Sequence, residues 1–94
     1  MLEGKRILVT GGTGSFGKMF TKYVLAHYKP GRLIIFSRDE LKQYMMQSEF
    51  PESKFPALRF FIGDIRDRHR LYRAFENVDI VVHAAALTQV PTAE

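Results

Sequence analysis

The sequence contains no cysteine and no tryptophan among its 94 residues. Without cysteine there is neither a disulfide framework nor a metal site built on thiolates, which fits a protein of a reducing compartment. No apolar run approaches the roughly 20 residues that span a bilayer, and the first residues lack the basic-then-apolar layout of a secretion signal. These absences predict a cytoplasmic location without membrane contact.

An acidic excess is also missing, since 14 lysines and arginines outnumber 10 acidic residues and give a net charge of +4. The basic residues are scattered, apart from a run between Arg66 and Arg73 that Asp67 interrupts. That run is more typical of a solvated helix face than of a nucleic-acid-binding stripe. We therefore expect no nucleic-acid partner, although a modest positive field suits an anionic ligand.

Short apolar runs alternate with amphipathic segments along the chain. The predicted strands cover residues 5–10, 32–36, 58–62 and 79–83, and the predicted helices cover residues 15–28, 38–49 and 68–75. Strands that are apolar on both faces, alternating with helices, indicate a parallel sheet covered on both sides. With right-handed crossovers, the pattern predicts an α/β fold, a three-layer Rossmann-type sheet of strand order 3-2-1-4, truncated after the fourth strand.

The spacing also predicts how the helices begin and which side chains they bury. Ser37 and Glu40 form a capping-box pattern for the second helix, and Asp67 is placed to cap the third. The side chains predicted to face inward are Phe16, Met19, Phe20, Tyr23, Val24 and His27 in the first helix, Leu41, Tyr44 and Met45 in the second, and Leu71, Ala74 and Phe75 in the third.

Glycines are concentrated between the first strand and the first helix. Gly11, Gly14 and Gly17 have the spacing of a dinucleotide-binding fingerprint, in the strand-to-helix context which that fingerprint requires. Gly11 would permit the tight turn, Gly14 would let a pyrophosphate approach the helix N-terminus, and Gly17 would let the helix pack closely on the first strand. Thr13 and Ser15 can add hydroxyl donors. The alternative is a glycine-rich turn that binds nothing.

The residues after the second strand indicate which dinucleotide would bind. Arg38 offers a guanidinium suited to a 2′-phosphate, and Lys42 can add a second positive charge, which favours NADP. Asp39 keeps NAD open, because an acid at this place can contact the ribose hydroxyl instead. A further alternative is that the serine and glutamate of this segment only cap the helix and Arg38 is solvated.

Two later strand ends complete the candidate site. Asp64 is placed to accept a hydrogen bond from the adenine amino group, with Ile65 against the ring; the alternative is an ordinary loop aspartate near Arg66. Ala84, after the fourth strand, is small where the backbone must pass close to the cofactor. His83 fits a packed, hydrogen-bonded role better than a catalytic one.

Four stretches carry a family resemblance: "TGGTGSFGK", "SRDELKQ", "RFFIGDIRD" and the segment around "HAAAL". Together they resemble the extended short-chain dehydrogenase/reductases, and most of all the inverting UDP-N-acetylglucosamine 4,6-dehydratases of bacterial sugar-nucleotide biosynthesis. The resemblance implies cofactor contacts from Thr13, Gly14, Ser15, Phe16, Ser37, Arg38, Asp39, Glu40, Leu41, Lys42, Asp64, Ile65 and Ala84.

The chain departs from that family at one position and in length. Thr88 stands where the family has a lysine expected to touch cofactor and substrate, so we assign it a substrate contact. The family's Tyr-x-x-x-Lys pair and its acid/base pair belong to a later part of the chain, and no catalytic residue is assigned here. Residues 1–94 are therefore expected to be the N-terminal part of an NADP-binding domain, inactive alone, with the catalytic and substrate-binding parts absent.

By resemblance, the parent enzyme is a lyase that acts on a UDP-sugar and uses NADP as a recycled oxidant. The exposed edge of the fourth strand predicts a homo-oligomer. Two alternatives stay open: a nucleotide-binding module without turnover, and a structural Rossmann fragment that self-associates.

Overall fold

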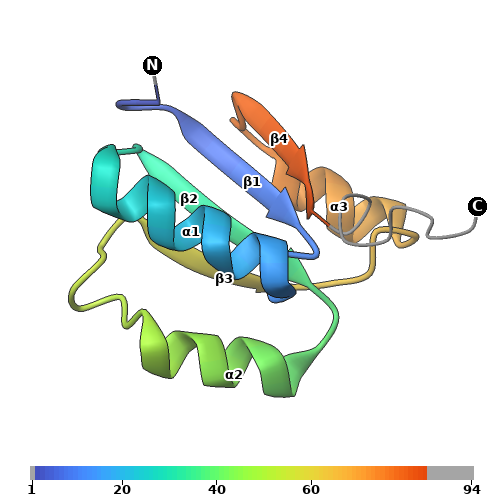
Figure 1. Cartoon of the computed structure of the whole chain (residues 1–94). Helices are drawn as coiled ribbons and strands as arrows, with labels where there is room; N and C mark the ends of the chain where they lie inside the picture. The colour runs from blue at the N-terminus through green and yellow to red at the C-terminus, as the bar shows by residue number, and fades with distance from the viewer. Residues whose placement is uncertain (1, 85–94) are drawn as a thin grey trace, which may run out of the picture.

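The computed structural model describes residues 2–84, which form a four-stranded sheet with helices on both faces (Figure 1). In chain order the elements are β1 (Arg6–Thr10), α1 (Ser15–His27), β2 (Arg32–Ser37), α2 (Glu40–Glu49), β3 (Leu58–Ile62), α3 (Arg68–Phe75) and β4 (Ile80–His83). All neighbouring strands are parallel and their spatial order is β3-β2-β1-β4. The predicted fold class and strand order are confirmed.

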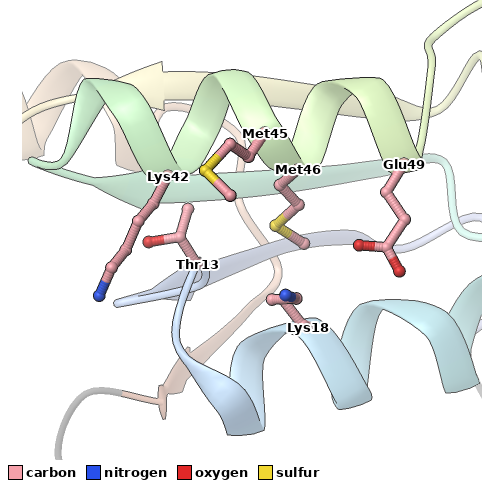
Figure 2. Close-up of a pocket in the computed structure, with 6 residues that line it drawn as sticks. All are labelled: Thr13, Lys18, Lys42, Met45, Met46 and Glu49. Carbon is pink, nitrogen blue, oxygen red and sulfur yellow. The ribbon is translucent and has the colours of Figure 1, made fainter.

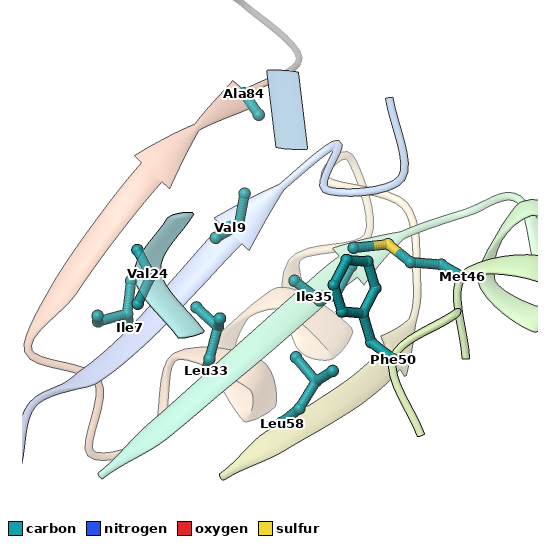
Figure 3. Packing of buried hydrophobic residues seen from close by; sticks show 9 residues of the cluster. All are labelled: Ile7, Val9, Val24, Leu33, Ile35, Met46, Phe50, Leu58 and Ala84. Carbon is teal, nitrogen blue, oxygen red and sulfur yellow. The ribbon is translucent and has the colours of Figure 1, made fainter. Parts of the chain in front are cut away.

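Each face of the sheet has its own hydrophobic core. The larger core lies under α1 and α2, where Ile7, Val9 and Ile35 are fully buried (Figure 3). The smaller core lies under α3, where Leu8 and Phe36 are fully buried. Because successive residues of β1 fill opposite faces, its middle residues Ile7, Leu8 and Val9 are all apolar, as expected for a central strand of a doubly covered parallel sheet.

The start of α2 corrects the sequence prediction. Its N-cap is Asp39 rather than Ser37, since Asp39 has an extended backbone and its carboxylate accepts a hydrogen bond from the Lys42 amide at 3.0 Å. Ser37 instead ends β2, and its hydroxyl accepts a hydrogen bond from Gln43 Nε2 at 2.9 Å. The capping-box interpretation was therefore wrong by two residues.

The buried face of α2 is also different from the predicted one. Leu41, Tyr44 and Met45 are all more than 60% exposed, whereas Gln43 and Met46 are only 2% exposed. The physical reason is that the Gln43 amide reaches backbone carbonyls at the ends of two strands, donating to Ser37 O at 3.2 Å and Phe61 O at 3.1 Å. The inner face of α2 therefore includes Gln43, a buried polar side chain whose amide is hydrogen-bonded, instead of the apolar side chains that the helical periodicity favoured.

The faces of the other two helices agree better with the prediction. In α1, Val24 is buried and Phe16 and Phe20 pack against the core, but Met19, Tyr23 and His27 are exposed, so half of the predicted face was wrong. In α3 the prediction is confirmed, because Asp67 caps the helix by accepting from the Arg70 amide and the three predicted side chains pack on the smaller core.

Candidate functional site

The carboxyl ends of three strands meet at one edge of the sheet and open into a cavity. Thr10 pairs in register with Phe36, and Ser37 pairs with Ile62, so the loops after β1, β2 and β3 emerge side by side. A cavity of about 560 Å³ lies there. It is lined by Gly11, Thr13, Gly14, Phe36, Ser37, Arg38, Asp39, Lys42, Gly63, Asp64, Ile65 and Arg66.

The loop after β1 presents its main chain to this cavity. Gly11 has a φ of 64°, in the left-handed region that favours glycine, so the predicted tight turn is confirmed. The Gly11 and Gly12 amides both donate to Phe36 O, at 2.8 Å and 3.4 Å, and tie the loop to the end of β2. Gly14 is the N-cap of α1 and provides no side-chain cap, so the positive end of the helix faces the cavity.

Gly17 permits a close approach, although to a different partner from the one predicted. A Cβ atom on Gly17 would fall against the backbone of Gly12, within 2.5 Å of its carbonyl carbon. The predicted contact was with the first strand, whereas the observed contact is with the loop that follows it. The glycine therefore sets the distance between the loop and the first turn of α1.

The end of β2 contributes the basic side chains. The Arg38 side chain is 71% exposed, and its Nη1 donates to Asp64 Oδ2 at 3.4 Å. Lys42 follows on the first turn of α2, beside Asp39, whose carboxylate caps that helix. The end of β2 and the start of α2 thus place two cations at the cavity, and one carboxylate oxygen of Asp39 is engaged by the Lys42 amide.

The loop after β3 holds Asp64 in an ion cluster. Arg66 Nη2 donates to Asp64 Oδ2 at 2.7 Å, and the Arg66 amide donates to Asp64 Oδ1 at 2.9 Å. The hydrogen bonds from Arg66, with a smaller contribution from the Arg38 charge, hold the pKa of Asp64 well below its ordinary value. Both carboxylate oxygens already accept hydrogen bonds, so a ligand amino group would share them with the two guanidinium groups.

Nine of the predicted site residues line the cavity: Gly11, Thr13, Gly14, Ser37, Arg38, Asp39, Lys42, Asp64 and Ile65. The remaining predicted contacts within the described residues do not line it: Ser15, Phe16, Gly17, Glu40, Leu41 and Ala84. Ala84 is fully buried in the larger core, Phe16 packs against that core, and Leu41 is exposed. Thr88 lies outside the described residues.

Sequence reasoning missed three residues that line the cavity: Phe36, Gly63 and Arg66. Gly63 and Arg66 belong to the "GDIR" stretch around Asp64. Their closeness in sequence to this predicted site residue could have indicated that they line the same cavity. At Gly63, a Cβ atom would lie 2.8 Å from the ring of Phe36 and 2.8 Å from Arg70 Cγ. A larger residue at position 63 would therefore displace the Phe36 ring or the Arg70 side chain.

His83 lies at the end of β4, where its Nδ1 is 3.0 Å from the hydroxyl of Thr10. The predicted hydrogen bond is therefore present, but the predicted packing is wrong, because His83 ends an edge strand of the described sheet and is exposed. Over residues 2–84, no cluster of three acidic or histidine side chains is placed to hold a metal ion. No helix in the same range is both long and apolar enough to cross a bilayer.

Comparison with known proteins gives this arrangement a family. Residues 7–94 match the model of the polysaccharide biosynthesis protein family. The chain is 56% identical over its whole length to a UDP-N-acetylglucosamine 4,6-dehydratase (inverting) of Campylobacter jejuni, and it covers 27% of that protein. An uncharacterized membrane protein of Methanocaldococcus jannaschii is 46% identical over 98% of the chain, which covers 26% of that protein.

A solved structure supports the fold. The X-ray structure of Pen from Bacillus thuringiensis superposes with a TM-score of 0.77 at 40% identity, over 86% of this chain and 24% of that one. The chain spans about a quarter of the length of the relatives it matches. It belongs to the polysaccharide biosynthesis protein family, among the extended short-chain dehydrogenase/reductases, and is similar to the N-terminal part of an inverting UDP-N-acetylglucosamine 4,6-dehydratase.

Proposed function

We propose that this chain is the NADP-binding portion of a sugar-nucleotide 4,6-dehydratase of the inverting type. The observation that carries the proposal is the single cavity that joins the glycine-rich loop, the basic end of β2 and the Asp64 loop. A dinucleotide needs these three chemistries in this order: donors for a pyrophosphate, a ribose-recognition element and an adenine pocket. The 56% identity to an enzyme named for this reaction supports the same conclusion.

The pyrophosphate would bind at the loop between β1 and α1. There, the uncapped N-terminus of α1 offers amide donors and a partial positive charge. Glycine at positions 11 and 14 leaves the main chain accessible, and the Thr13 hydroxyl borders the same space. The Gly11 and Gly12 amides already donate to Phe36 O, so the pyrophosphate would use the amides at the start of α1.

The adenosine would extend along the ends of β2 and β3. Arg38 and Lys42 give two positive charges beside the ribose position, which favours a 2′-phosphate over a free hydroxyl. The adenine ring would lie against Ile65, which is 51% exposed in this structure and can bury apolar surface on binding. Asp64 would accept from the adenine amino group, next to Arg66.

The bound nicotinamide would supply a reversible hydride acceptor for oxidation of the sugar at C4, after which water is lost across C5 and C6. The residues of this chain would bind and orient that group, while proton transfer would fall to residues outside this chain. We therefore propose a UDP-sugar as substrate of the whole enzyme, and no turnover by these 94 residues alone.

Titration of the purified chain with NADPH and NADH, followed by nicotinamide fluorescence, tests the proposal. We expect NADPH to bind more tightly than NADH. Arg38→Ala should weaken NADPH binding roughly tenfold, since a hydrogen bond to a charged group contributes about 1.5 kcal/mol or more. Arg73→Ala is the matched control, because Arg73 is exposed on α3 and does not line the cavity.

The other outcomes distinguish the alternatives. Equal affinity for the two dinucleotides would contradict the choice of NADP and favour a ribose contact from Asp39. No binding of either at millimolar concentration would contradict the proposal altogether and leave a structural Rossmann fragment.

The cellular location is part of the same proposal. A cysteine-free sequence fits the reducing cytoplasm. Cell fractionation with an antibody to this chain tests that location. Recovery in the membrane fraction would contradict it and would agree instead with the name of the Methanocaldococcus relative, which is called a membrane protein.

A further inference from the structure

A second cavity, of about 250 Å³, lies between α1 and α2 (Figure 2). It shares Thr13 and Lys42 with the larger cavity, so the two adjoin at the glycine-rich loop. Its other lining residues are Lys18, Met45, Met46 and Glu49. A ligand group at the rim shared by the two cavities would therefore contact both of them.

Two lysines line the smaller cavity from opposite helices, and one of them, Lys42, also lines the larger cavity. Figure 2 shows Lys42 reaching from α2 and Lys18 rising from α1, with Thr13 of the loop between them. Both lysines are exposed, and neither forms an ion pair in the part of the chain that the structure describes. Two unneutralised ammonium groups beside a hydroxyl form an environment suited to an anion.

Arg38 lines the larger cavity, beside Asp64. Its guanidinium Nη1 lies 3.4 Å from Asp64 Oδ2, at the end of β3, and Arg38 does not line the cavity between the helices. The carboxylate partly neutralises Arg38, whereas Lys18 and Lys42 have no such partner among residues 2–84. The acid within the smaller cavity is Glu49, the last residue of α2, at the opposite end of that helix from its N-cap.

We propose that Lys18 is a specificity-determining residue for NADP. Together with Lys42, it brackets the 2′-phosphate of the adenosine ribose where the two cavities meet, and the Thr13 hydroxyl donates to the same phosphate. This inference rests on the proposed function and deepens it: recognition of the extra phosphate is divided between Arg38 and a pair of lysines on different helices. Glu49 opposes that recognition by placing a negative charge in the same cavity.

The test compares two small probes, 2′,5′-ADP and 5′-AMP, which differ by the 2′-phosphate. Isothermal titration calorimetry is run at low and high salt with the unaltered chain, Lys18→Gln and Lys22→Gln. Lys22 is the matched control, because it is an exposed lysine of α1 that does not line the cavity. Lys18→Gln should weaken 2′,5′-ADP binding about two- to fivefold, as expected for an exposed ion pair. It should leave 5′-AMP binding unchanged.

Two further measurements sharpen the result. The loss caused by Lys18→Gln should shrink at high salt, where exposed charges are screened. Glu49→Gln should strengthen 2′,5′-ADP binding, because it removes the opposing charge. Far-UV circular dichroism of each variant verifies that it is folded.

The outcomes separate this inference from the function on which it rests. If the unaltered chain prefers 2′,5′-ADP and Arg38→Ala removes that preference while Lys18→Gln behaves like Lys22→Gln, the role of Lys18 is refuted and NADP binding stands. Equal losses for both probes in Lys18→Gln would also refute it. No binding of either probe by the unaltered chain would refute the proposed function itself.

Discussion

Asp64 shows how a single carboxylate can organise two arginines around a binding cavity. It accepts hydrogen bonds from the amide, Nε and Nη2 of Arg66 within the same loop, and one longer bond from Arg38 across the strand ends. The ionised form of Asp64 is therefore favoured in the folded protein, and its pKa is lowered. The Arg66 pKa is raised by the same contact.

The lowered pKa predicts how stability changes in acid. Near pH 4 the unfolded chain binds a proton at Asp64 that the folded chain does not, so the free energy of unfolding falls as the pH drops through and below that value. Asp64→Asn should flatten this fall, measured as thermal midpoints between pH 2.5 and pH 6. Glu49→Gln, at an acid that forms no ion pair within the described residues, should leave the fall intact. An equally steep fall in Asp64→Asn would contradict the argument.

At the scale of an element, α2 is attached to the sheet by a buried polar side chain as well as by the buried Met46. Gln43 bridges the ends of β2 and β3 through Ser37 and Phe61. The exposed side chains Leu41, Tyr44 and Met45 face away from that attachment. The helix that carries Lys42 is thereby fixed relative to the cavity.

Gln43→Leu should destabilise the chain by about 1–3 kcal/mol, because it keeps the bulk but leaves the Phe61 carbonyl without its buried donor. Gln47→Leu, at an exposed position of the same helix, should change the free energy of unfolding by less than about 0.5 kcal/mol. Urea unfolding followed by circular dichroism measures both. Equal stability of the two variants would show that the amide bridge contributes nothing.

At the scale of the whole molecule, the strands of the sheet differ in how many neighbouring strands they pair with. β1 and β2 have neighbours on both sides, whereas β4 pairs only with β1 over residues 2–84. Val81 of β4 is 38% exposed. A partly exposed apolar strand with free backbone groups is a template for pairing with another chain.

We expect the chain to self-associate through β4 at tens of micromolar. Sedimentation velocity should show a species larger than a monomer, and Val81→Lys should shift it toward the monomer, since a charge on an edge strand opposes edge pairing. Lys54→Glu, which changes a charge in the exposed loop before β3, should leave the distribution unchanged. A single monomeric boundary for the unaltered chain would contradict this prediction.

The strands and the glycine-rich turn could be predicted because each depends on local chemistry. Four short apolar runs define the sheet, and the conformation of Gly11 follows from a turn that only glycine adopts easily. The inner face of α2 could not be predicted, because burial of Gln43 depends on carbonyls 6 and 18 residues away. The engagement of Asp64 by Arg66 was open to prediction, but its bidentate geometry depends on the folded loop.

The two hydrogen bonds from Gly11 and Gly12 to Phe36 O have a consequence for binding energetics. They join the glycine-rich loop to the end of β2, close to Arg38, so the two sides of the cavity that the proposed dinucleotide would bridge are already tied together. A dinucleotide that bridges them would lose little affinity to ordering the protein. The heat and entropy of association should then report mainly on desolvation of the ligand and of the lysines that meet it.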